Sequence, residues 1–279
     1  MTALPGPDAA DHVCWVYDDD EAFDAAVRQF LAGGVARGER LLCVGERVID
    51  SVRAGGDGDD VESLLADGRL ELLTVAEAYA ATGRFAPERQ LAFYDAATRR
   101  AVADGYRGLR VVADLTPLAE DESARADLLR WEHRADAYMA SGSGMSAMCA
   151  YRGDLPADVL TDVAGAHPLV HAGRRVPAFR LFFEEAGLAL AGSVDTFDAD
   201  RLAALLWSST AEGPVVTLDL TFLEFIDGAG CRVLARWARE LATRSIALEL
   251  RGAPRIVERM WTLLGFSALA PVTFAGAPA

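Results

Sequence analysis

The segment TLDLTFLEFIDGAGC, residues 217–231, predicts a buried strand, a sharp turn and the start of a helix. The strand is the apolar run that begins at Val215, and the turn is centred on Asp227 and the glycines that follow it. A turn that opens a helix presents free backbone N–H groups, which suit an anion, a phosphorylated side chain or a protein partner. This turn is therefore the first candidate for a functional surface.

The composition is that of a globular protein with a large negative charge. Of the 279 residues, 52% are hydrophobic and 25% are charged, and the formal net charge is −15. The length is sufficient for one large domain or two ordinary domains with a real core. Nucleic-acid-binding surfaces need clustered Lys and Arg, so we expect no nucleic-acid partner.

The sequence also predicts a soluble cytoplasmic protein. It contains no run of eighteen apolar residues that would span a membrane, and the first residues lack the basic region and apolar core of a signal peptide. Cysteines that are scattered within apolar stretches are typical of buried thiols and not of a disulfide framework. They are Cys14, Cys43, Cys149 and Cys231.

Strands and helices alternate through the first part of the chain. Apolar runs predict strands at residues 12–17, 40–44, 70–75, 109–113 and 146–151. Helical spacing predicts helices at residues 21–37, 61–67, 87–104, 121–140 and 156–164. Alternation of this kind requires crossover connections, so we expect an α/β fold with a mainly parallel sheet covered by helices on both faces.

The pattern changes after a linker at residues 173–177, which separates a domain at 1–172 from a domain at 178–279. Two strands, 179–184 and 188–192, are joined by a hairpin signal. The elements expected after them are a helix at 197–210, a strand at 215–220, a helix at 231–243, a strand at 246–250, a helix at 254–264 and a strand at 272–274.

Four separated segments of the second domain resemble the STAS family, the domain of bacterial anti-sigma-factor antagonists and of sulfate-transporter tails. The segments are 191–195, 216–221, 225–230 and 263–266. The resemblance implies a small α/β domain with helices on one side of its sheet and a partner-binding surface at the turn. The residues implied for that surface are Asp195, Thr221, Asp227, Gly228, Ala229 and Gly230. The implied partner is an anti-sigma factor or a serine-kinase-like regulator.

In the antagonist branch of that family, a serine or threonine directly after the aspartate is phosphorylated. Here Gly228 and Ala229 follow Asp227, and neither carries a hydroxyl. We therefore expect no phosphorylation at the usual position. The alternative acceptors are Thr221, Ser193 and Thr196, although hydroxyls in turns more often satisfy backbone groups.

The first domain resembles the MEDS domain, a sensory module of methanogen and methylotroph regulators. The motifs that carry the resemblance are His12–Asp18, Leu41–Gly45, Leu109–Asp114 and Met148–Tyr151, followed by His167 and Pro168. That family is related to RecA-like ATPases but lacks their phosphate loop. The resemblance therefore implies a RecA-like sandwich.

Nucleotide chemistry is not expected on this domain. A phosphate loop ends in Gly-Lys-Ser/Thr, whereas Gly45, Glu46 and Arg47 follow the second strand, and Glu46 would repel phosphate. Asp114 sits where an ATPase holds Mg²⁺, but without the loop it suits a turn or a helix cap. The segment 141–144 lacks the nucleophile elbow of a hydrolase. We therefore expect that the protein is not an enzyme.

The predicted ligand-binding residues are His12, Cys14, Tyr17, Asp114 and His167. The histidine equivalent to His12 is a suspected ligand contact in the resembling family, while a lone histidine at a strand end is otherwise structural. Zinc or iron held by His12, Cys14, His167 and His171 is an alternative. Because Pro168 prevents an ordinary helical pair of the two last histidines, we predict no metal and no cofactor.

Together these features predict a two-domain bacterial signalling protein that regulates transcription. The first domain would detect a small molecule or a partner, and the STAS domain would pass this state on by docking to an anti-sigma factor or a similar regulator. The alternative is a constitutive scaffold or assembly protein that uses the STAS surface for static contacts. The missing hydroxyl at Gly228 favours this alternative, and self-association of the chain is left open.

Overall fold

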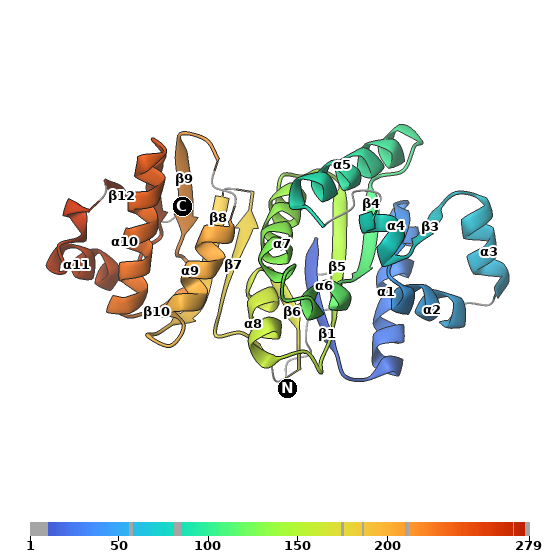
Figure 1. The fold of residues 1–279 in the computed structure, drawn as a ribbon. Coiled ribbons are helices and arrows are strands. Elements are labelled where there is room, and N and C mark those ends of the chain that lie inside the picture. Colours follow the sequence, from blue (N-terminus) through green and yellow to red (C-terminus); the bar gives the residue numbers. More distant parts are fainter. Residues whose placement is uncertain are drawn as a thin grey trace. The chain divides into compact units, whose positions relative to one another are not determined.

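The structure is a computed structural model that describes residues 11–55, 58–80, 85–173, 176–185, 187–209, 212–269 and 271–276. The chain forms two compact units (Figure 1). The first consists of residues 1–164 and 168–176, and the second of residues 165–167 and 177–279. Each unit is built on its own six-stranded sheet, which confirms the α/β class.

All strand pairs in the sheet of the first unit are parallel, and the strand order is β3-β2-β4-β5-β1-β6. The strands are β1 (His12–Tyr17), β2 (Arg40–Val44), β3 (Leu70–Leu73), β4 (Leu109–Asp114), β5 (Met145–Arg152) and β6 (Leu169–His171). The first strand of the chain therefore lies inside the sheet, between β5 and β6. The predicted parallel sheet is confirmed.

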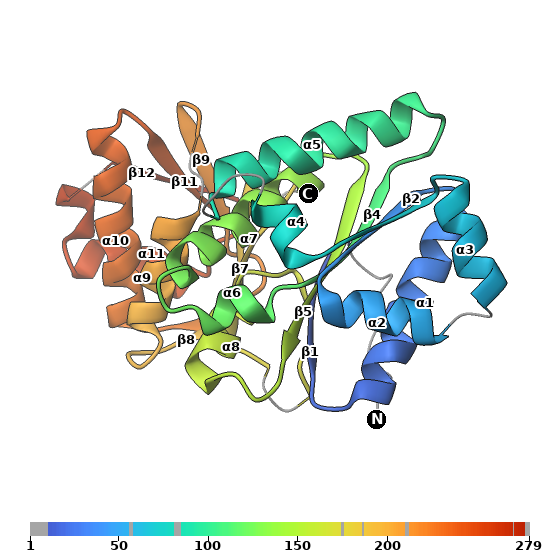
Figure 2. The ribbon, with the colours of Figure 1, turned by 45° about the vertical axis from the view of Figure 1, so that its right-hand side comes forward.

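Helices cover both faces of this sheet (Figure 2). They are α1 (Asp20–Arg37), α2 (Glu46–Gly55), α3 (Gly58–Ala66), α4 (Val75–Ala80), α5 (Pro87–Ala103), α6 (Thr116–Glu120), α7 (Arg125–Ala140) and α8 (Ala157–Gly165). On one face Phe23 and Phe30 of α1 pack with Val48 of α2. On the other face Tyr94 of α5 packs against Trp131 of α7, with ring centroids 5.3 Å apart.

Several short elements of the first unit were not predicted. The segment after β2 forms α2, whose buried residues Val48, Ile49 and Val52 follow helical spacing. The helices α4 and α6 and the three-residue strand β6 are too short to give a clear periodic pattern. The helix expected from residue 121 begins only at Arg125.

The second unit has the strand order β10-β8-β9-β11-β12, with β7 paired to β8. Its elements are β7 (Phe179–Glu184), β8 (Gly187–Val194), α9 (Ala199–Ser208), β9 (Val215–Asp219), β10 (Leu223–Ile226), α10 (Gly228–Thr243), β11 (Ala247–Arg251), α11 (Arg255–Leu263), a 3-10 turn (Phe266–Ala268) and β12 (Val272–Ala275). The β7–β8 pair is antiparallel, as the hairpin signal predicts, and the other pairs are parallel.

Burial alternates along the strands of this second sheet. Leu218, Leu248 and Leu250 are fully buried, while their neighbours Thr217 and Glu249 are only half-buried. One face of the sheet therefore carries the helix-covered core, as the resemblance implied.

Two elements around the opening segment differ from the prediction. The edge strand β10 was not predicted, because it has only four residues and their burial does not alternate. The helix α10 starts at Gly228 and not at residue 231, since Asp227 caps it. The glycines assigned to the turn are thus the first turn of the helix.

Candidate functional site

Most of the residues predicted to bind a partner lie together where β8 and β10 end, whereas Thr221 follows β9, whose last residue pairs with Ala189, six residues before Asp195. Asp195 follows β8 and Asp227 follows β10, and these strands are parallel neighbours in which Val194 pairs with Ile226. The Asp227 N–H donates to the Val194 carbonyl at 3.2 Å. Thr221 follows the end of β9, another parallel neighbour of β8. All these side chains therefore belong to the carboxyl ends of parallel strands.

Asp227 closes the start of α10. Its backbone is extended (φ −93°, ψ −176°), and its Oδ1 accepts hydrogen bonds from the Ala229 N–H at 2.8 Å and from the Gly230 N–H at 2.9 Å. A side-chain carboxylate thus already occupies the place that an external anion would take. The expectation of free N–H groups at this turn is wrong for these two donors, and the turn is better suited to a protein partner than to an anion.

The two glycines of this first helical turn have different surroundings. A Cβ at Gly228 would meet only Leu264 Cδ1, at an ordinary contact distance of 3.8 Å. A Cβ at Gly230 would lie 2.6 Å from Ile226 Cγ1 and 3.1 Å from Val194 Cγ1. Packing therefore requires glycine at position 230 but not at position 228, where a serine would fit.

Large apolar side chains lie exposed in the segments that flank these strand ends. We call five of them the apolar rim: Phe197, Phe222, Phe225, Leu263 and Leu264, with exposed fractions of 91%, 60%, 53%, 80% and 47%. Large exposed apolar side chains in segments next to a candidate site favour an interaction surface there. This rim was not predicted from the sequence, because an isolated Phe or Leu in a short strand or turn looks like a core residue.

The alternative phosphate acceptors take part in local contacts. The Thr221 N–H donates to Asp219 Oδ1 at 2.7 Å, which is a turn contact, and the Thr221 side chain is exposed. Ser193 Oγ lies 3.5 Å from Glu224 Oε2. The exposed Thr196 lies directly before Phe197, whose N–H donates to Asp195 Oδ1 at 2.8 Å.

In the first unit, β2 passes into α2 through the single residue Gly45. This glycine has a φ of +104°, and a Cβ there would lie 3.0 Å from the Cβ of Asp114 on β4. The close approach of the two backbones and the one-residue connection leave no length of chain for a phosphate loop. The connection between β2 and α2 therefore does not hold a phosphate loop.

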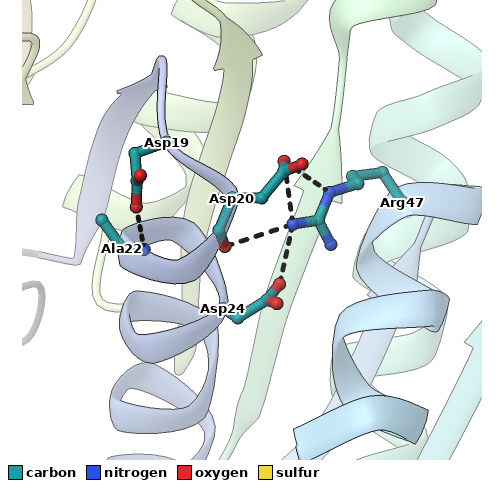
Figure 3. Close-up of polar contacts among 5 residues, drawn as sticks. All are labelled: Asp19, Asp20, Ala22, Asp24 and Arg47. Atoms are coloured by element: carbon teal, nitrogen blue, oxygen red, sulfur yellow. Dashed lines mark hydrogen bonds and ion pairs between the residues drawn. The ribbon is translucent and has the colours of Figure 1, made fainter.

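The first basic residue of α2, Arg47, is bound by acidic residues of α1 (Figure 3). Its Nη2 lies 3.1 Å from Asp20 Oδ1 and 2.8 Å from Asp24 Oδ1, while Asp19 caps α1 by accepting from the Ala22 N–H at 2.7 Å. Arg47 is therefore engaged by two carboxylates within the domain.

Tyr17 and Asp114 belong to this same carboxyl end of the first sheet. Asp114 Oδ1 accepts from the Thr116 N–H at 3.0 Å, so it serves as a turn residue as expected. Burial raises the pKa of Asp114, while burial and the charge of Asp114 raise the pKa of Tyr17 to about 12. At neutral pH Tyr17 is thus a neutral phenol.

His12 and Cys14 lie elsewhere, because successive side chains of a strand point to opposite faces. Cys14 belongs to the core under α5 and α7, whereas Tyr17 belongs to the core under α1 and α2. His167 is buried, and it is one of four residues, with His12, Glu132 and Cys149, whose possible ligand atoms all lie within 4.8 Å of one another. The predicted ligand set therefore does not form one site: Tyr17 and Asp114 lie in one place, and His12, Cys14 and His167 lie in another.

His12 is the centre of a group of fully buried polar side chains, which we call the buried polar cluster: His12, Glu132, Asp136, Cys149 and Tyr151. His12 Nδ1 lies 2.9 Å from Asp136 Oδ1, and its Nε2 lies 3.3 Å from Glu132 Oε2. Cys149 Sγ lies 3.5 Å from His12 Nε2 and 3.4 Å from Glu132 Oε2. The Tyr151 hydroxyl donates to the other Glu132 oxygen, Oε1.

The protonation states in this cluster follow from its burial and its charges. Burial lowers the pKa of His12, but the hydrogen bonds and charges of Asp136 and Glu132 outweigh it and raise this pKa to about 9. Burial, together with the charge of Glu132, raises the pKa values of Cys149 and Tyr151. An imidazolium thus faces two carboxylates, a thiol and a phenol.

Four members of the cluster were missed by the sequence analysis. Glu132 and Asp136 come from α7, and Cys149 and Tyr151 come from β5. A signal was present for the acidic pair, because it lies on the same helical stripe as the buried Leu128, Ala135 and Met139. Carboxylates on an apolar stripe are rarely buried without partners.

None of the helices in the described part of the chain combines the length and the apolar character that crossing a bilayer requires.

Comparison with known families gives two matches. Residues 11–168 match the model of the MEDS family, described as the methanogen/methylotroph, DcmR sensory domain, and residues 178–271 match a model described as Mlab, STAS domain. No curated protein matches the chain. The predicted order of the two domains is confirmed, and STAS domains commonly mediate protein–protein interaction. A sensory domain joined to a STAS domain indicates a signalling or regulatory role. The chain thus belongs to the MEDS family, with a STAS domain following its sensory domain.

Proposed function

We propose that the MEDS domain detects a small molecule or a partner, and that the STAS domain passes this state on by docking to an anti-sigma factor or a similar regulator. The protein would act in the cytoplasm as a regulator of transcription and not as an enzyme. The observation that supports this proposal best is the apolar rim at the carboxyl ends of the second sheet, beside a helix start that Asp227 holds in one shape.

The shape of this docking surface does not depend on phosphorylation of the turn. Asp227 satisfies two N–H groups of α10, and Gly228 offers no hydroxyl to a kinase. A protein partner can bury the exposed rings of Phe222 and Phe225, and the removal of these rings from water stabilises the complex. We therefore assign control of docking to the sensory domain, by a shift between two populations of the whole protein.

A non-enzymatic role agrees with the side chains at the carboxyl end of the first sheet. Arg47 is engaged by Asp20 and Asp24, and Asp114 is engaged by the N–H of Thr116. These groups stabilise the turns of the domain and do not form a constellation of nucleophile and base.

The docking half is tested by binding of the full-length protein to candidate anti-sigma kinases. We expect Phe225→Glu to weaken binding at least tenfold, because it places a charge in the apolar rim. Val102→Glu is the matched control, since Val102 of α5 is equally exposed (52%, against 53% for Phe225) but lies in the other unit. Equal affinities of the two variants for every partner that binds the wild type would contradict the proposal.

A constitutive scaffold is the second candidate, and Gly228 is the observation that favours it. A scaffold would bind its partner with the same affinity whatever the state of the sensory domain. Comparing the partner affinity of the wild type with that of His12→Ala, after checking that the variant is folded, separates the two candidates. A change supports sensing, and equal affinities support the scaffold.

A further inference from the structure

We propose that the buried polar cluster is a binding site for a divalent transition-metal ion, Zn²⁺ in the first place, with His12 Nε2, Glu132 Oε2 and Cys149 Sγ as ligand atoms. The three atoms come from β1, α7 and β5 and lie within 4.8 Å of one another, and a ring nitrogen of the buried His167 lies within the same distance of them. The proposal goes beyond the function proposed above and does not depend on it, because ion binding is measured without a partner.

The distances between the three atoms match one face of a tetrahedral zinc site. Bond lengths of about 2.0–2.1 Å to nitrogen and oxygen and about 2.3 Å to sulfur give tetrahedral edges of about 3.3 Å between N and O and about 3.6 Å to sulfur. The observed edges are 3.3 Å for His12 Nε2 to Glu132 Oε2, 3.5 Å for Nε2 to Cys149 Sγ, and 3.4 Å for Oε2 to Sγ. An ion can therefore bind with little movement of these side chains.

The neighbours of the ligand atoms are those that metal sites use to orient their ligands. Asp136 Oδ1 binds His12 Nδ1 at 2.9 Å, which leaves Nε2 as the ring nitrogen that points to the ion. The Tyr151 hydroxyl binds Glu132 Oε1, which leaves Oε2 for the ion. In His12 and Glu132, the side-chain atom that is not used for the ion is therefore already engaged. The set of imidazole, carboxylate and thiolate is typical of zinc.

The charge of the cluster is also compatible with a bound divalent cation. Two carboxylates beside one imidazolium leave a net negative charge in a fully buried place, which is costly. On binding, His12 loses the proton on Nε2 and Cys149 loses its thiol proton, so the divalent charge replaces two protons and the net charge does not change. The thiolate, which burial disfavours in the free protein, is stabilised by the ion itself.

The first test uses the full-length protein, stripped with a chelator and titrated with Zn²⁺ against a chromophoric competitor. We expect one ion per chain for the wild type, loss of this binding in Cys149→Ala, and unchanged binding in Cys43→Ala. Cys43 is the matched control, because it is an equally buried cysteine in the core on the other face of the same sheet. With Co²⁺ in place of Zn²⁺, the wild type should show the thiolate-to-metal absorption band that Cys149→Ala lacks.

A variant that keeps all three ligands covers the case in which Cys149→Ala does not fold. Asp136→Asn removes only the charge that orients His12, so we expect affinity to fall by about 10–100-fold with the far-ultraviolet spectrum unchanged. A folded wild-type protein that binds no Zn²⁺ or Co²⁺ would overturn the proposal. Equal losses in Cys149→Ala and Cys43→Ala, or no change in affinity for Asp136→Asn, would also overturn it.

Discussion

The pH dependence of stability gives a sharp test of the buried polar cluster in the metal-free protein. The pKa of His12 is about 9 in the folded chain, against an ordinary value of 6.5. Because the folded state binds this proton more tightly, the stabilisation is fully present below pH 6.5 and is lost as the pH rises to about 9. The difference of about 2.5 between the two pKa values corresponds to about 3 kcal/mol at 1.36 kcal/mol per pKa unit.

The groups that face His12 determine the pH range in which stability is expected to change. Glu132 and Asp136 stabilise the imidazolium, while Cys149 and Tyr151 have raised pKa values. The loss between pH 6.5 and 9 is therefore assigned to His12.

The measurement is urea denaturation of chelator-treated protein from pH 6 to pH 10. Unfolding is monitored by hydrogen exchange of peptides from β1 and β5, which report on the first unit alone. We expect the free energy of unfolding to fall by about 3 kcal/mol across this range in the wild type. Asp136→Asn should show a smaller fall, because it removes one of the carboxylates that hold the proton on His12. If the wild type shows no fall, or if both proteins lose the same free energy, the reasoning about His12 is refuted.

Substitutions at three positions test the start of α10, each by the free energy of unfolding of the second unit. Gly228→Ser should change this free energy by less than about 0.5 kcal/mol, and a large destabilisation would contradict the open space seen there. The same variant should create a site that a partner kinase phosphorylates, as phosphopeptide mapping would show. Gly230→Ala should cost about 1–3 kcal/mol, because its Cβ would lie 2.6 Å from Ile226 Cγ1, and a stability equal to that of Gly228→Ala would refute this. Asp227→Ala should cost about 0.5–2 kcal/mol through loss of the helix cap, and Asp227→Asn, which keeps an accepting oxygen, should recover most of it.

The sequence predicts well the elements that are long or strongly patterned. The apolar runs at 12–17 and 109–113 are strands, and both appear in a parallel sheet as the alternation with helices requires. The element β10 escapes prediction, because its four residues follow a turn and only two of them are buried. The start of α10 escapes it too, because glycine usually ends a helix, and only the capping bonds of Asp227 show that one begins here.

The candidate site is less accessible to prediction, because its members meet only in the folded chain. His12 and Cys14 were predicted from the sequence. Two partners of His12, Asp136 and Cys149, lie 124 and 137 residues away from it along the chain. Tyr17 is close to His12 in sequence, but the alternation of a strand places it in the opposite core. The prediction therefore placed Tyr17 in one site with His12 because the two are close in sequence, whereas they lie on opposite faces of the sheet.

The place of β1 inside the sheet has a consequence for how the protein is made. β1 is synthesised before the other strands of its sheet, yet its two neighbours, β5 and β6, are the last strands of that sheet to be synthesised: His12 pairs with Ala147, and Val13 pairs with Leu169. Until those residues emerge, the apolar strand β1 has no pairing strand, and it is exposed to aggregation with other chains. A nascent chain that stops before β5 should therefore depend on chaperones, and the sensory domain can close only when its end has been translated.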